Sequence, residues 1–143
     1  MRRLRGDRGA SALELSIVAP GLLLLIFFSI QAGLFFYGRA VAIQAAREGV
    51  SQLRLAQTED AARQVQGDIE AGIEGYAAVV GREALVDPEA TSTYDEDAGR
   101  VSVTVTGRTI VLVPGINLVA TGTAEGQIER FEGDVGNLPG LVP

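Results

Sequence analysis

The sequence contains neither cysteine nor histidine. Without cysteine the chain has no disulfide framework, no thiolate metal site and no lipidated cysteine, which excludes a lipoprotein. Without histidine it lacks the commonest general base and the commonest metal ligand. The acids that remain form no evident pair that could hydrolyse a substrate. We therefore expect no catalytic activity, no metal site and no cofactor.

Lysine is absent as well, so all twelve basic residues are arginines. An arginine-only composition with abundant alanine, glycine and valine is typical of a GC-rich coding sequence and indicates a bacterial protein. Acidic residues dominate after Arg54, which argues against nucleic-acid binding. Four arginines crowd the start of the chain, where they would meet anionic membrane lipid: Arg2, Arg3, Arg5 and Arg8.

A long uncharged segment follows these arginines. No charged residue lies between Leu15 and Gly38, and a helix over this segment is about 35 Å long, which exceeds the hydrocarbon core of a bilayer. The arginine bias predicts a single pass through the cytoplasmic membrane, with the N-terminus inside and the C-terminal part outside. Four parts result: a basic leader at 1–9, a transmembrane and assembly helix at 10–38, an extracytoplasmic domain at 39–132 and a flexible tail at 133–143.

The start of the span favours a processing site over a conventional secretory signal. The apolar run is too long for such a signal, and residues 29–32 match its cleavage site poorly. A cut after Gly9 would place the new amino group of Ala10 one helical turn before Glu14. An ionised carboxylate inside a bilayer costs on the order of 3 kcal/mol, so this amino group, from the same or a neighbouring subunit, would stabilise it. Alternatively, Glu14 only caps the helix at the headgroup level.

Two stretches resemble a known family. Gly9, the small residues 10–12 and Glu14 resemble the class III signal of type IV pilin-like proteins. Residues 17–25 are similar to the TadE-like pseudopilins of tight-adherence (Flp) pili, as is a second motif made of Ala45, Ala46, Arg47, Glu48 and Gly49. The chain departs from the family at Leu15, where phenylalanine is common, and at residues 31–34, where an acid often precedes Gly-Arg.

The resemblance implies a minor pilin or pseudopilin of a Tad pilus, with a pilin-like α+β fold. Prepilin peptidase would cleave after Gly9, and Glu14 would be the assembly glutamate. The partners would be the peptidase, other pilin subunits and the inner-membrane assembly platform, and the product would join an extracellular pilus that supports adhesion. Two alternatives remain: a permanently anchored envelope scaffold, and a type II secretion pseudopilin, which shares the signal but not the motif at 45–49.

The span itself carries breaker and small residues. Pro20 removes a backbone hydrogen bond and Gly21 follows at once, which predicts either a functional weakness or a harmless kink. Two pairs of small residues would allow another helix to approach closely: Ser29 with Gly33, and Ala42 with Ala46.

Beyond the span the sequence predicts two helices. The first continues from Arg39 to about Leu55 and carries a narrow apolar stripe, made of Val41, Ala45, Val50 and Leu53. The second begins after Thr58 as N-cap and ends at Gly81. Its predicted buried face consists of Val65, Ile69, Ile73, Tyr76 and Val80.

Alternation then predicts a small antiparallel sheet that covers the helices. Val101, Val103 and Val105 alternate with polar residues in one strand, which pairs with residues 91–94 across a loop at 95–99. Gly99 takes the loop position that needs a positive φ. Residues 110–113 and 120–131 are predicted as further strands.

The tip of this hairpin carries three adjacent acids: Asp95, Glu96 and Asp97. They partly resemble a calcium-binding loop but lack its distal bidentate glutamate. A charged hairpin tip is therefore the favoured interpretation.

Overall fold

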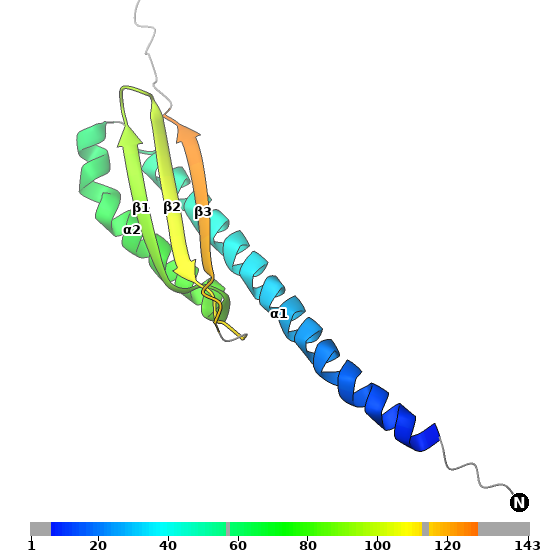
Figure 1. The fold of residues 1–143 in the computed structure, drawn as a ribbon. Helices are drawn as coiled ribbons and strands as arrows, with labels where there is room; N and C mark the ends of the chain where they lie inside the picture. The colour runs from blue at the N-terminus through cyan, green and yellow to red at the C-terminus, as the bar shows by residue number, and fades with distance from the viewer. Residues whose placement is uncertain (1–6, 57, 113–114, 129–143) are drawn as a thin grey trace, which may run out of the picture.

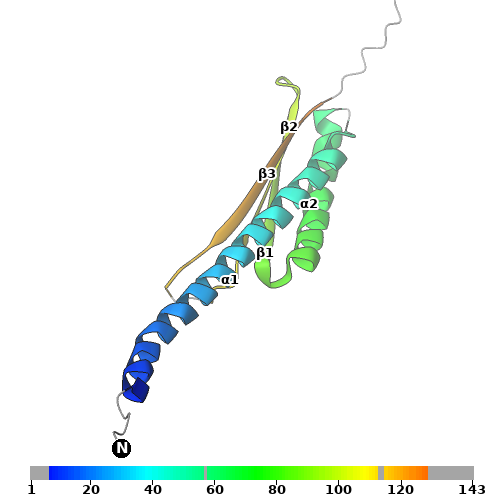
Figure 2. The ribbon, with the colours of Figure 1, turned by 90° about the vertical axis from the view of Figure 1, so that its right-hand side faces the viewer.

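Two helices lie against one face of a three-stranded antiparallel sheet (Figures 1 and 2). The computed structural model describes residues 7–56, 58–112 and 115–128, with side chains from residue 13 onward. In chain order the elements are α1 (Asp7–Leu53), α2 (Glu59–Gly81), the short 3-10 helix η1 (Arg82–Ala84), β1 (Val86–Asp95), β2 (Arg100–Arg108) and β3 (Val119–Gln127). The predicted α+β fold, a long helix followed by a second helix and a small antiparallel sheet, is confirmed.

The second half of α1 supplies the centre of the core. All four residues of its predicted stripe are buried: Val41, Ala45, Val50 and Leu53. The sheet approaches this half very closely, because a side chain on Gly122 of β3 would overlap the backbone of Ala42 and Ile43. Small residues at the contact therefore set the distance between α1 and β3.

Helix α2 begins and ends where the sequence predicts, but its predicted buried face is correct only for Ile73, which is buried, and Ile69, which is partly buried against the core. The Thr58 hydroxyl accepts a hydrogen bond from the Ala61 N–H at 3.2 Å, which caps the first turn. The helix buries four residues, namely Ala62, Ile73, Ala77 and Gly81. The predicted core positions Val65, Tyr76 and Val80 are 41%, 42% and 36% exposed, so the prediction is wrong for them. Close packing of α2 on α1 and β1 favours its alanines over these larger side chains.

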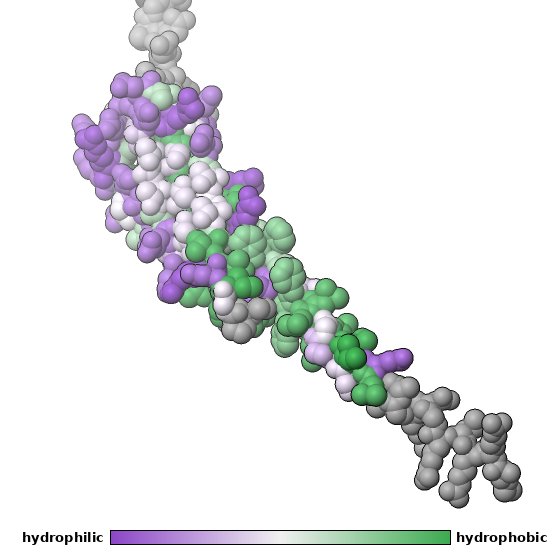
Figure 3. Space-filling view, in the orientation of Figure 1, coloured by the Kyte–Doolittle hydropathy of each residue, from purple (hydrophilic) through white to green (hydrophobic). Residues whose placement is uncertain are grey.

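The hairpin between β1 and β2 forms as predicted. Tyr94 pairs with Val101, and Gly99 in the connecting loop has a φ of 62°. The alternating valines Val101, Val103 and Val105 are fully buried under the helices. The residues between them face away from the helices, where the hydroxyls of Thr104 and Thr123 lie 3.0 Å apart. Figure 3 shows this outer face as a surface of intermediate hydropathy with a hydrophilic rim.

One predicted strand does not form. Residues 110–112 lie in the connection between β2 and β3, outside any strand. The Ile110 N–H donates to the Glu83 carbonyl at 3.1 Å, so this backbone bonds to η1 and not to a strand. An apolar run suits a loop that meets another apolar surface as well as it suits a buried strand, and composition does not separate the two. The last strand begins at Val119, within one residue of the prediction, and ends at Gln127, so Ile128 lies outside it; the rest of the predicted strand, 129–131, lies outside the described residues.

Side chains of α2 occupy the free edge of β1. The Glu70 carboxylate accepts hydrogen bonds from the Ser92 N–H at 2.7 Å and the Ser92 hydroxyl at 2.6 Å. The Gln66 amide donates to the Ser92 carbonyl at 2.9 Å, and Glu74 accepts from the Ala90 N–H at 2.9 Å. Burial alone raises the pKa of Glu70, but the hydrogen bonds from Ser92 and Gln66 together outweigh it and lower that pKa below its ordinary value. These contacts close the edge to pairing with another strand.

Candidate membrane-anchoring and assembly helix

The first half of α1 extends away from the sheet and from α2 (Figures 1 and 2). Residues 13–30 are exposed except for Ala19, and they include Ile17, which is 77% exposed, and Leu24, which is 63% exposed. A core helix of a soluble protein would bury such a stretch, whereas none of its most apolar window is buried here. Figure 3 shows the hydrophobic surface along this half. Its length and composition indicate that α1 anchors the chain in a membrane.

The residues of the predicted processing site lie at the base of this half. Gly9 and Ala10 belong to α1, which begins at Asp7, and their side chains lie outside the described part. Glu14 is exposed, and the next charged residue along α1 is Arg39. A single acid therefore marks one end of an uncharged stretch of helix.

Helix α1 runs without a break through Pro20. A side chain at Gly21 or at Gly33 would meet no atom within 4 Å, so both positions face open space. The hydroxyl of Ser29 donates to the Leu25 carbonyl at 2.8 Å, one turn earlier on the same helix. The surface around Ser29 and Gly33 thus remains open to another helix.

The second pair of small residues has a different role. Ala42 and Ala46 are fully buried, and the backbone of Ala42 contacts β3 at Gly122. This face of α1 is occupied by the chain's own sheet, so another helix does not reach it in this structure. Ala45 and Gly49 are also buried within the domain. A side chain on Gly49 would overlap Ile73 of α2.

The remaining residues of the 45–49 motif point outward. Arg47 and Glu48 are exposed, and Glu48 accepts a hydrogen bond from the Gln52 amide at 3.0 Å. The motif therefore combines a small buried face with a charged solvent face on one turn of α1. Packing of the domain therefore explains the small residues of the motif, namely Ala45, Ala46 and Gly49.

Sequence reasoning missed Gln31, which is 3% exposed within the apolar stretch. Its amide nitrogen donates to the Ile110 carbonyl at 3.0 Å, and its amide oxygen accepts from the Leu112 N–H at 2.7 Å. The signal that could have identified it is a single amide side chain among 24 uncharged residues of a predicted span, because such a group needs a partner at that depth.

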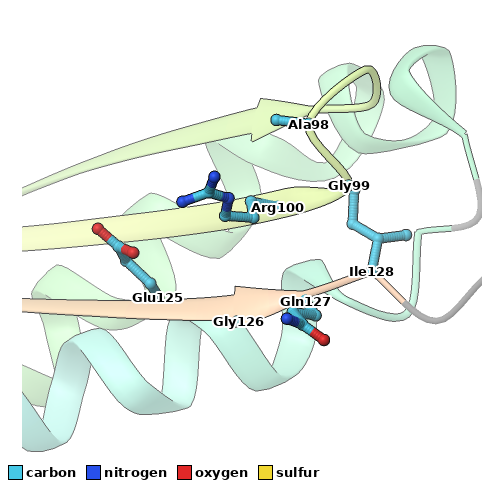
Figure 4. A pocket seen from close by; sticks show the side chains of 7 residues that line it. All are labelled: Ala98, Gly99, Arg100, Glu125, Gly126, Gln127 and Ile128. Atoms are coloured by element: carbon cyan, nitrogen blue, oxygen red, sulfur yellow. The ribbon is translucent and has the colours of Figure 1, made fainter.

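A hollow and two capping acids lie near the tip of the hairpin between β1 and β2. A hollow between the hairpin tip and the end of β3 has Arg100 and Glu125 on the same side of the strands (Figure 4). Two of the three acids at the hairpin tip cap backbone groups: Asp95 accepts from the Ala98 N–H at 2.8 Å, and Glu96 accepts from the Glu59 N–H at 3.2 Å. Within the described residues no group of three or more acids is arranged to hold a metal ion.

Comparison with known proteins gives one family. Residues 9–51 match the family model described as TadE-like protein, and this region covers the exposed half of α1 and the 45–49 motif. No curated protein and no solved structure matches the chain. Residues 9–51 are therefore similar to TadE-like proteins, and this similarity suggests an association with Tad pili.

Proposed function

We propose that this protein is a minor pilin or pseudopilin of a Tad (Flp) pilus, and that it has a non-catalytic role in assembly. The observation that carries the proposal is the exposed, uncharged half of α1 with one acid near its start. Such a surface has two environments open to it, the membrane before assembly and neighbouring helices within a fibre. The domain of α2 and the sheet would remain outside the cytoplasmic membrane, in the orientation with the N-terminus inside.

Cleavage after Gly9 by prepilin peptidase would give Glu14 a partner. Removal of residues 1–9 leaves a helix that begins with the charged amino group of Ala10, one turn before Glu14. An unpaired carboxylate costs on the order of 3 kcal/mol in an apolar environment. In a fibre, the amino group of a neighbouring subunit would remove this cost by neutralising the Glu14 carboxylate. The pair would fix the axial position of one subunit relative to the next.

The open face at Ser29 and Gly33 supports the same role. Small residues four apart allow two helices to approach closely. Ser29 and Gly33 are both exposed, and a side chain at Gly33 would meet no atom within 4 Å. The corresponding residues Ala42 and Ala46 are buried within the domain, and β3 lies against Ala42. We therefore propose that other pilin subunits pack on the first half of α1, while the second half holds the domain.

The intact mass of the membrane-extracted protein tests the processing step. We expect a loss of residues 1–9 when prepilin peptidase is co-expressed and the full mass when it is not. A Gly9→Val variant should stay at full mass with the peptidase present, because the bulkier residue would not fit where the enzyme accepts glycine. An unchanged wild-type mass in both cases would contradict the proposal and favour a permanently anchored envelope protein.

A further inference from the structure

The connection between β2 and β3 carries an apolar surface that the proposed function does not use. Four large apolar residues of this connection and of the start of β3 are between 38% and 49% exposed: Ile110, Leu112, Ile116 and Val119. They lie at the end of the domain from which the exposed half of α1 emerges (Figures 1 and 2). In Figure 3 the hydrophobic surface of α1 continues onto this end of the domain.

Gln31 fixes this connection to α1 at a defined height. Both polar atoms of its side-chain amide bond to backbone groups of Ile110 and Leu112. At the start of the connection, the Thr109 N–H donates to the Leu118 carbonyl at 3.0 Å. The backbone of the connection is thus bonded internally at these positions, while its apolar side chains face outward.

The height of Gln31 along α1 places it within the bilayer. The helix rises about 1.5 Å per residue, so Gln31 lies about 26 Å from Glu14. A hydrocarbon core of about 30 Å that begins at Glu14 extends beyond this point, and any tilt of the helix extends it further. Irregular backbone is tolerated at this depth only when its polar groups are bonded within the protein, as Gln31 arranges here.

An apolar hollow lies beside the connection. It has a volume of about 210 Å³ and is lined by Phe28, Phe35 and Phe36 of α1 together with Ile116 and Leu118. Phe35 and Phe36 pack edge to face, with ring centres 5.7 Å apart. Along the helix, Phe28 and Phe36 lie about 21 Å and about 33 Å from Glu14, so the hollow spans the outer part of a hydrocarbon core of about 30 Å.

We propose that the β2–β3 connection dips into the lipid leaflet nearest the domain, with Ile110, Leu112 and Ile116 among the acyl chains. The occupant of the apolar surface and of the hollow is lipid, because the surface is continuous with the part of α1 that crosses the membrane. The domain is thereby held against the bilayer at two places, through α1 and through this connection. The proposal rests on membrane anchoring through α1 and not on cleavage after Gly9.

Tryptophan reporters test the depth of the connection, since the chain has no tryptophan of its own. The full-length protein is reconstituted at low protein-to-lipid ratio in phosphatidylcholine vesicles with or without bromine on the acyl chains. We expect the emission of Leu112→Trp to be quenched by bromine to a degree similar to that of Leu24→Trp, which lies in the exposed half of α1. Leu55→Trp is the matched control, because Leu55 is 81% exposed at the opposite end of the domain and should not be quenched.

Quenching of Leu24→Trp without quenching of Leu112→Trp would overturn the proposal, provided that circular dichroism shows the wild-type fold. Ile116→Trp repeats the test if Leu112→Trp misfolds. If Leu24→Trp also escaped quenching, the membrane anchor itself would be wrong and the proposal with it. The peptidase-dependent mass change reports on cleavage alone, so the two proposals fail separately.

Discussion

Gln31 and Glu70 each form hydrogen bonds to backbone groups that have no hydrogen-bond partner in a neighbouring strand. Gln31 bonds the connection between β2 and β3, and Glu70 bonds Ser92 at the outer edge of β1. Both side chains extend from helices onto segments far away in the sequence. Removing either side chain would leave partly buried polar groups without hydrogen-bond partners. The free-energy cost of such unpaired groups exceeds what a typical hydrogen bond contributes to stability.

Glu70→Ala should lower the free energy of unfolding by about 1–3 kcal/mol, because the Ser92 N–H and hydroxyl both lose their acceptor. The measurement is denaturant unfolding of the full chain in detergent, followed by circular dichroism. Asp68→Ala is the control, since Asp68 is an exposed acid on the same helix and should change stability by less than about 0.5 kcal/mol. Equal effects of the two substitutions would contradict the role assigned to Glu70.

The lowered pKa of Glu70 predicts a pH dependence. A carboxyl whose pKa is lower in the folded than in the unfolded state binds fewer protons when folded, so it stabilises the fold above its ordinary pKa of 4.5. This contribution is lost as pH falls below that value and through the folded pKa. Unfolding midpoints should fall more steeply with acidification in the wild type than in Glu70→Gln. Parallel profiles of the two proteins below pH 4.5 would be inconsistent with this account.

Residue roles were predictable where they depend on local sequence. Turn chemistry predicts a positive φ at Gly99, and capping chemistry predicts Thr58 as the N-cap of α2. Both predictions are confirmed. Gln31 was not predictable in this way, because its two partners lie 79 and 81 residues further along the chain. A polar residue in an apolar segment signals a need for partners but does not identify them.

At the scale of elements, α1 is one continuous helix with two different surfaces. Its first half exposes large apolar side chains, and its second half buries small ones under the sheet and α2. The change occurs near Gln31, so the domain contacts α1 earlier than the boundary at residue 39 that composition suggests. Glycine and alanine on both sides of the contact allow the second half of α1 to lie close to β3.

Two glycine substitutions should have opposite effects on stability. Gly122→Ala adds a methyl group that would overlap the backbone of α1, so we expect a loss of several kcal/mol or failure to fold. Gly72→Ala is the matched control on α2, where the added group meets no atom within 4 Å and should raise stability by about 0.5–1 kcal/mol. Thermal unfolding of the full-length variants measures both. A tolerated Gly122→Ala would show that α1 and β3 are further apart than described.

The elements that sequence patterns located correctly are those with local signals. The caps of α2 and the valine alternation of β2 are such signals. The buried face of α2 was assigned by side-chain size, and it failed at Val65, Tyr76 and Val80 because close helix packing selects alanine. Residues 110–113 were predicted as a strand, and residues 110–112 are not in one, because an apolar run alone does not distinguish a buried strand from a loop with apolar side chains.

For the whole molecule, the two surfaces of α1 separate anchoring from folding. The domain has its own core, made of the second half of α1, α2 and the buried face of the sheet. No described residue in the exposed half of α1 belongs to that core, so the environment of this half could change from lipid to neighbouring subunits without unfolding the domain. The β2–β3 connection would have to leave the lipid during the same step.

The proposed place of the protein in a pilus depends on Glu14. We expect wild-type protein, cleaved after Gly9, in the fibre fraction sheared from cells that carry the complete pilus system. Glu14→Ala should be cleaved normally but reduced at least roughly tenfold in that fraction, since the amino group left without a partner would cost on the order of 3 kcal/mol in an apolar environment and a tenfold change needs only about 1.4 kcal/mol. Equal amounts of the two cleaved proteins in the fibre fraction would contradict the pairing of Glu14 with an amino group. Wild-type protein confined to the membrane fraction would contradict its incorporation altogether.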